Sequence, residues 1–223
     1  MTITLLFMAG LMAVVVWWLV RQTIAARPWV AQGQQGATED FSDSTLHQPV
    51  AKLGLYVFLA VVTSLFALFI SAYVMRMKLG DWRPLPEPDL LWINTGALIL
   101  SSIALQWARV SAHQEQADRM RVGLLAGGVF ALAFMVGQLL AWQQLVDLGY
   151  FVNTNPANAF FYLITGLHGL HLLGGLVAWS RTTIKVFGGM EVADVRLSVE
   201  LCAIYWHFLL LVWMILFGLM LST

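Results

Sequence analysis

Charged residues are scarce in this chain of 223 residues: Lys and Arg total 12, Asp and Glu total 12, and together they make up 11% of the sequence. The two signs cancel, so no basic face indicates nucleic acid and no charged tail indicates electrostatic docking. The single cysteine, Cys202, excludes both a disulfide framework and a thiolate metal site within the chain. A lone thiol in an apolar run is typical of a small buried side chain.

Apolar residues are abundant instead, at 60% of the sequence, which is too many for a soluble domain of this length. A helix needs about 20 apolar residues to span a bilayer, and six stretches are long enough. They lie near residues 2–20, 53–75, 90–108, 122–146, 158–180 and 197–222. We predict a span for the first rather than a cleaved signal peptide, because it lacks a basic n-region and its apolar run is too long. The expected fold is all-α and integral to the membrane, a helical bundle of six transmembrane helices.

The distribution of Lys and Arg predicts the orientation. In a six-span topology, nine of these 12 residues fall on one side of the membrane, in residues 21–52, 109–121 and 181–196. The other side carries only Arg76, Lys78 and Arg83. Because cytoplasmic loops carry the excess of positive charge, we expect the first group in the cytoplasm and both termini outside.

The polar segment 21–52 predicts an irregular cytoplasmic strap. With the first span it would form an N-terminal part, residues 1–52, ahead of a five-helix membrane domain at 53–223. The three prolines within residues 82–90 exclude a helix before about Asp89. We find no internal repeat and no matched pair of interrupted helices, which disfavours a secondary transporter.

Histidines lie within two of the predicted spans, and ionisable groups at bilayer depth mark a function or a buried polar joint. His168 and His207 are each about 15 Å deep, near the midplane of neighbouring antiparallel helices. Two facing imidazoles meet the geometric need of a b-type haem. The alternative is a helix–helix joint with hydroxyl or carbonyl partners, among them Thr165 and Glu200. We favour the joint, since nothing in the sequence marks room for a macrocycle.

A metal site is a weaker hypothesis. His168 and His171 are three residues apart, but the carboxylates of a di-metal bundle, in Glu-x-x-His repeats, are missing. Glu200 lies only three residues into its predicted span, where a carboxylate reaches cytoplasmic water. We therefore predict no metal ligand in the chain.

The stretch TGLHGLHLLGG at 165–175 resembles the signature of subunit III of the haem–copper respiratory oxidases, the cytochrome c oxidase subunit III family. Stretches at 53–76, 86–108 and 200–213 match further motifs in the same order, so the resemblance covers about residues 50–222. Seven residues at motif positions are our candidates for lipid-binding or interhelix polar contacts: Thr165, His168, His171, Glu200, Tyr205, Trp206 and His207.

The resemblance implies a non-catalytic accessory subunit of a bacterial terminal oxidase, in the bacterial inner membrane. Such a subunit packs on oxidase subunit I, binds structural phospholipid in a cleft, and supports proton uptake and stability. Haem and copper are then expected in partner subunits, and no active site or cofactor in this chain. A subunit III homologue of a quinol oxidase or nitric-oxide reductase remains an alternative, because the catalytic partner makes that distinction. A membrane protein that binds haem b through two histidines is the second alternative.

Two residues depart from the family pattern. Val62 stands where the family usually has a glutamate, and Leu210 where it usually has an aspartate. Each change removes a carboxylate from membrane depth. The resemblance therefore implies a scaffold role more than any role that rests on those acids, such as lipid anchoring or a proton-linked step.

Overall fold

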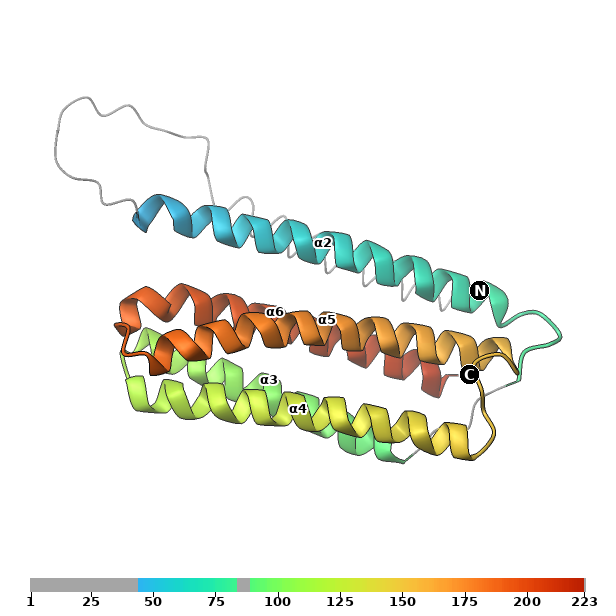
Figure 1. The fold of residues 1–223 in the computed structure, drawn as a ribbon. Coiled ribbons are helices and arrows are strands. Elements are labelled where there is room, and N and C mark those ends of the chain that lie inside the picture. The colour runs from blue at the N-terminus through green and yellow to red at the C-terminus, as the bar shows by residue number, and fades with distance from the viewer. Residues whose placement is uncertain (1–43, 84–88, 223) are drawn as a thin grey trace, which may run out of the picture. The chain divides into compact units, whose positions relative to one another are not determined.

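The computed structural model describes residues 44–83 and 89–222, and within them every regular element is an α-helix (Figure 1). The helices are α2 (Ser44–Arg76), α3 (Leu90–His113), α4 (Ala117–Asp147), α5 (Pro156–Phe187) and α6 (Val192–Leu221). All five are long and apolar enough to cross a membrane. The multi-pass helical fold is thus confirmed, with five spans in the described residues rather than six. The predicted first span, 2–20, lies outside them.

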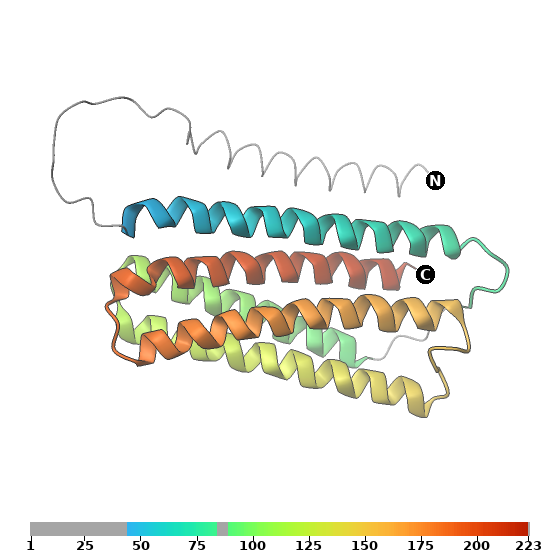
Figure 2. The same ribbon diagram turned by 45° about the horizontal axis from the view of Figure 1, so that its top comes forward.

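The described residues from Val57 to Ser222 form one compact unit. Within it, α3, α4, α5 and α6 each pack against the next, and α6 packs back against α3, which closes a four-helix bundle (Figures 1 and 2). The part of α2 from Val57 onward joins α5 and α6 through large side chains. This arrangement places α6 between α3 and α5, so polar residues on α6 have two neighbouring helices as partners.

The prediction of an irregular strap up to residue 52 is wrong for its last part. Helix α2 begins at Ser44, so residues 44–52 are helical. The other helices also extend beyond their apolar runs; α4, for example, begins at Ala117 rather than near residue 122. A run of about 20 apolar residues corresponds only to the hydrocarbon core of the bilayer. The helix itself continues through the polar interface, because its backbone hydrogen bonds do not depend on apolar side chains.

Short polar contacts fix the turns at one end of the bundle. Helix α3 begins at Leu90, as the prolines before it predict. Asn155 caps α5 by accepting a hydrogen bond from the Ala157 backbone N–H at 3.2 Å, and its side-chain amide donates to the Arg83 carbonyl at 2.6 Å. At the end of α2, Arg76 hydrogen-bonds to Asp81, which holds the pKa of that carboxyl below its usual value.

Helices α3 and α4 approach closely at Gly123. A Cβ atom built on Gly123 would lie 2.9 Å from both the carbonyl oxygen of Ala104 and the backbone nitrogen of Ala108. A side chain could avoid this added Cβ atom by changing its rotamer, but the backbone atoms of α3 cannot. In a membrane, such packing of small residues is a main source of helix association, because the hydrophobic effect between helices is absent.

We therefore expect Gly123→Ala to lower the free energy of unfolding by about 1–3 kcal/mol, the usual cost of overpacking a tight contact. Gly174→Ala is the matched control, because a Cβ at Gly174 meets nothing within 4 Å. It is expected to be neutral or to stabilise α5 by up to about 1 kcal/mol through helix propensity. Unfolding of the full-length chain in mixed micelles measures both. Equal stability of the two variants would contradict the close approach of Gly123 to the backbone of α3.

Candidate functional site

His168 joins α5 to α6. Its side chain is fully buried, and Nε2 donates a hydrogen bond to the Leu209 carbonyl at 3.1 Å. The ring lies between Phe134 and Trp213, at centroid distances of 5.7 and 5.2 Å. A carbonyl only accepts, so Nε2 carries the proton and Nδ1 presents a lone pair with no partner among the described residues.

Thr165, one turn earlier on α5, joins α5 to α4 instead. Its hydroxyl donates to the Phe161 carbonyl at 2.7 Å and accepts from the indole N–H of Trp142 at 3.1 Å. Thr165 is buried, and the two bonds use its donor and one acceptor position. Thr165 is therefore not a histidine partner, contrary to the expectation from the sequence.

His207 joins α6 to α3. Its Nε2 donates to Gln106 Oε1 at 3.0 Å, and the Ser102 hydroxyl hydrogen-bonds to Nδ1. Both ring nitrogens are thus used by α3, while His168 bonds to the backbone of α6. The two imidazoles do not present free nitrogens to a common iron, so this geometry gives no support to the bis-histidine haem hypothesis.

His171 and Tyr205 lie on the α5–α6 side that α2 covers, and Trp206 lies next to Tyr205. His171 Nδ1 donates to the Leu167 carbonyl of its own helix at 2.8 Å, and its ring lies 5.5 Å from that of Phe66 on α2. The Tyr205 hydroxyl donates to the His171 carbonyl at 2.9 Å. Trp206 is fully buried, with its ring 6.3 Å from that of Tyr205.

Glu200 pairs with Arg109 across α3 and α6, at 3.2 Å, with the carboxylate side chain 14% exposed. A second pair, Arg196 with Glu115, lies 3.5 Å apart near the same end of the two helices. Together with the hydrogen bonds from His207 to α3, they form a line of polar contacts that we call the α3–α6 seam. Glu200 was expected among the partners of the histidines, but its ion-pair partner is Arg109.

Sequence reasoning missed the α3 half of this seam. Ser102, Gln106 and Arg109 recur at intervals of four and three residues, which places them on one face of a helix. Polar residues at that spacing inside an apolar span were the available signal. Thr95, a further two turns back, accepts a hydrogen bond from the Trp213 indole at 2.9 Å and extends the α3–α6 contact.

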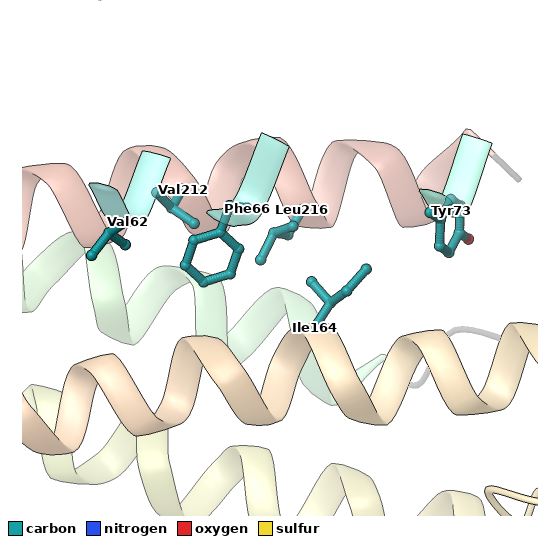
Figure 3. Packing of buried hydrophobic residues seen from close by; sticks show 6 residues of the cluster. All are labelled: Val62, Phe66, Tyr73, Ile164, Val212 and Leu216. Carbon is teal, nitrogen blue, oxygen red and sulfur yellow. The ribbon is translucent and has the colours of Figure 1, made fainter. Parts of the chain in front are cut away.

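Val62, where the resemblance implies a glutamate, lies in an apolar cluster. Its side chain is 2% exposed and lies beside Val212 of α6, in a cluster that also includes Phe66 of α2 and Ile164 of α5 (Figure 3). A valine suits this environment, whereas a carboxylate would lose its hydration there. Leu210, at the other departure, is partly buried on α6.

No three His, Cys, Asp or Glu residues gather closely enough to hold a metal ion in the part of the chain that the structure describes. The fold and these contacts together define a multi-pass helical membrane protein whose intramembrane polar residues join helices. The candidate site is thus a set of interhelix joints: Thr165, His168 and His207 bond to neighbouring helices, and Glu200 forms an ion pair with α3.

Comparison with known proteins identifies the family. A family model described as cytochrome c oxidase subunit III matches residues 2–222. Cytochrome c oxidase subunit 3 of Thermostichus vulcanus is 31% identical over 184 residues, covering 78% of this chain and 88% of that protein. A probable cytochrome c oxidase subunit 3 of Mycobacterium leprae is 31% identical over 182 residues, with the same two coverages. The Arabidopsis thaliana subunit 3 is 28% identical over 193 residues, 78% of this chain and 72% of that protein.

The chain belongs to the cytochrome c oxidase subunit III family, and the resemblance in the motifs is confirmed. Membership implies an accessory subunit in a complex with other oxidase subunits. It also agrees with the apolar, multi-pass character of the chain.

Proposed function

We propose that this chain is the non-catalytic subunit III of a bacterial haem–copper oxidase and packs against subunit I, which with its partners holds the haem and copper. The observation that carries the proposal is the family match over residues 2–222. The charge distribution supports a position in the cytoplasmic membrane with six spans and both termini outside. The division at residue 52 into an N-terminal part and a membrane domain belongs to this proposal.

The proposed role of the seven candidate residues is structural. His168 and Thr165 hold α5 against α6 and α4, and His207 and Glu200 hold α6 against α3. A rigid bundle supports proton uptake in subunit I indirectly, by keeping the catalytic subunit intact. None of these residues needs to change its protonation state for this role.

We further propose that α2, α5 and α6 hold structural phospholipid through its acyl chains. Aromatic side chains gather there: Phe58 is 46% exposed, and its ring lies 6.1 Å from Tyr205 and 6.5 Å from His171. Val62 offers no carboxylate to a headgroup or its bound cation. The proposed lipid contact therefore rests on apolar and aromatic surface rather than on charge.

A pull-down through this chain in mild detergent tests the proposal. We expect a large haem-containing subunit to co-purify, a reduced-minus-oxidised haem spectrum of that complex, and phospholipid in its mass spectrum. The isolated chain should show no haem signal. The co-purifying subunit also distinguishes a cytochrome c oxidase from a quinol oxidase or a nitric-oxide reductase. Purification of the chain as a stable monomer without an oxidase subunit, or a haem spectrum from the chain alone, would overturn the proposal.

A further inference from the structure

Three buried side chains of the four-helix bundle carry polar atoms that have no hydrogen-bond partner among the described residues. They are Asn94 of α3, Gln138 of α4 and His168 of α5, with exposed fractions of 3%, 4% and 0%. The unpaired atoms are Nδ2 of Asn94, both Oε1 and Nε2 of Gln138, and Nδ1 of His168. Such atoms are costly inside a membrane protein, because lipid offers them no hydrogen bond in place of the water that they lose.

Asn94 lies against α4 directly beside Gln138. A Cβ atom built on Gly137, the residue before Gln138, would overlap Oδ1 of Asn94. The Asn94 carboxamide therefore occupies the space that the glycine leaves free on α4. Two amide side chains with unpaired atoms thus meet where α3 contacts α4.

Contacts between α4 and α5 place Gln138 at the level of His168. Phe134 and Trp142 lie one turn before and one turn after Gln138 on α4. The ring of Phe134 is 5.7 Å from that of His168, and the indole of Trp142 donates to Thr165, one turn before His168 on α5. Because these two contacts lie on either side of Gln138, its side chain lies in the layer between Thr165 and His168.

The chemistry of the unpaired atoms indicates what binds them. The amide nitrogens of Asn94 and Gln138 are N–H donors, whereas Oε1 of Gln138 and Nδ1 of His168 are acceptors. The N–H donors would repel a cation, and the lone pairs would repel an anion. A neutral molecule that both donates and accepts satisfies all of these atoms. Water is the smallest such molecule, and a buried water typically makes about three hydrogen bonds to groups of this kind.

The polar layer is connected to one end of the bundle, where α3 begins, α4 ends and α5 begins (Figures 1 and 2). Asn94 lies four residues from that end of α3, and Gln138 lies nine residues from the end of α4, or about 6 and 14 Å along the helices. Asn158, near the start of α5, is also buried, and its Oδ1 has no partner among the described residues. Unpaired polar atoms therefore occur from this end of the bundle to His168.

We infer that the bundle binds ordered water between Asn94, Gln138 and His168. The water accepts hydrogen bonds from the two amide groups and donates to Nδ1 of His168 and Oε1 of Gln138. This internal hydration site joins α3, α4 and α5, and the hydrogen bond from His168 Nε2 to the Leu209 carbonyl adds α6. With both ring nitrogens engaged, His168 is held in one tautomer and one orientation.

Radiolytic labelling of the full-length chain in mixed micelles tests the hydration site. An X-ray pulse in isotopically labelled water forms hydroxyl radicals from bound water, and mass spectrometry locates the oxygen that they add to nearby side chains. We expect Phe134, one turn from Gln138, to be labelled several-fold more than Phe66. Both phenylalanines are buried, but Phe66 lies in the apolar cluster of α2. Equal labelling of the two residues would overturn the inference.

Two glutamine substitutions on α4 test which residue holds the water. Gln138→Leu removes the amide of the hydration site, and we expect labelling of Phe134 to fall to the level of Phe66. Gln143→Leu makes the same chemical change at an exposed position of α4 and should leave the labelling of Phe134 unchanged. Labelling that persists in Gln138→Leu, or that falls equally in both variants, would overturn the site. The labelling of the unmodified chain decides the question even if Gln138→Leu does not fold.

Thermal unfolding of the same variants gives a second readout. If the Gln138 amide had no partner at all, leucine would remove a desolvated polar group and raise the unfolding midpoint. With bound water we expect Gln138→Leu to lower the midpoint by about 2–4 °C, the shift typical of losing one buried hydrogen-bonding partner in a chain of this length. A raised midpoint would overturn the inference. So would a lowered midpoint without labelling of Phe134, because the three side chains would then bond to one another directly.

Discussion

Replacing Trp213 with alanine is expected to lower the free energy of unfolding by about 3–5 kcal/mol, the usual cost of truncating a buried aromatic residue. Trp213 is fully buried at the centre of the four-helix bundle. Its ring lies 4.9 Å from that of Phe134 on α4 and 5.2 Å from that of His168 on α5, and its indole N–H donates to Thr95 on α3. One side chain of α6 thus contacts all three other helices of the bundle.

Two control variants separate the causes of this loss. Trp107→Ala removes the same side chain from an exposed position on α3, where it is 43% exposed, and should cost far less in the isolated chain. Trp213→Phe keeps an aromatic ring but loses the hydrogen bond to Thr95, worth about 0.6 kcal/mol, and leaves a small cavity, so a loss between those of the other two variants is expected for it. Thermal unfolding of the full-length chain in detergent, followed by circular dichroism, measures all three. Similar losses from Trp107→Ala and Trp213→Ala would contradict the central role of Trp213.

The sequence predicted the spans well and their ends poorly, for one physical reason. Hydropathy reports where the hydrocarbon begins, so the described helices all contain a predicted apolar run. Helical hydrogen bonding, however, does not stop at the hydrocarbon boundary. Helix α2 therefore begins at Ser44 and α6 at Val192, several residues before their apolar runs. The prolines before Leu90 were a better guide to a helix start, because proline lacks the backbone N–H and restricts the residue before it.

The histidines were identified from the sequence, but their partners were not. We assumed that His168 and His207 share the joint between sequence-adjacent α5 and α6. The bundle instead places α6 against α3 as well, so His207 bonds to Ser102 and Gln106, which are about a hundred residues away in the chain. Which side of a helix meets which neighbour depends on the packing of the whole bundle. Propensity and periodicity within one helix do not contain that information.

The sequence motifs identified the family, which the depth and spacing of single residues could not do. The depth of a histidine in the membrane does not by itself distinguish a hydrogen-bonded helix–helix joint from haem ligation. The ordered motifs at 53–76, 86–108, 165–175 and 200–213 indicated the family, and the family model matches the same region. Val62 and Leu210 show the limit of that transfer, because a family role follows only where the residue that performs it is present.

Restoring the family's acid with Val62→Glu is expected to lower the free energy of unfolding by about 3 kcal/mol, the order found for a charge at the centre of a transmembrane helix. Val62 lies midway along the span Val50–Arg76, in an apolar cluster that includes Phe66, Val212 and Leu216 (Figure 3). None of these three side chains has a hydrogen-bond donor for a carboxylate. The loss should be smaller in acid, because the protonated carboxyl carries no charge.

Val62→Gln is the matched control, since it has nearly the same shape as glutamate and no charge. Its loss measures the cost of the added volume and polarity in the cluster, and the difference between the two variants at neutral pH measures the cost of charge. Unfolding in mixed micelles at neutral and acidic pH gives both quantities. If Val62→Glu is as stable as Val62→Gln at neutral pH, a cation or donor reaches position 62. In that case the apolar packing of α2 against α5 and α6 would not explain why a carboxylate is absent from position 62.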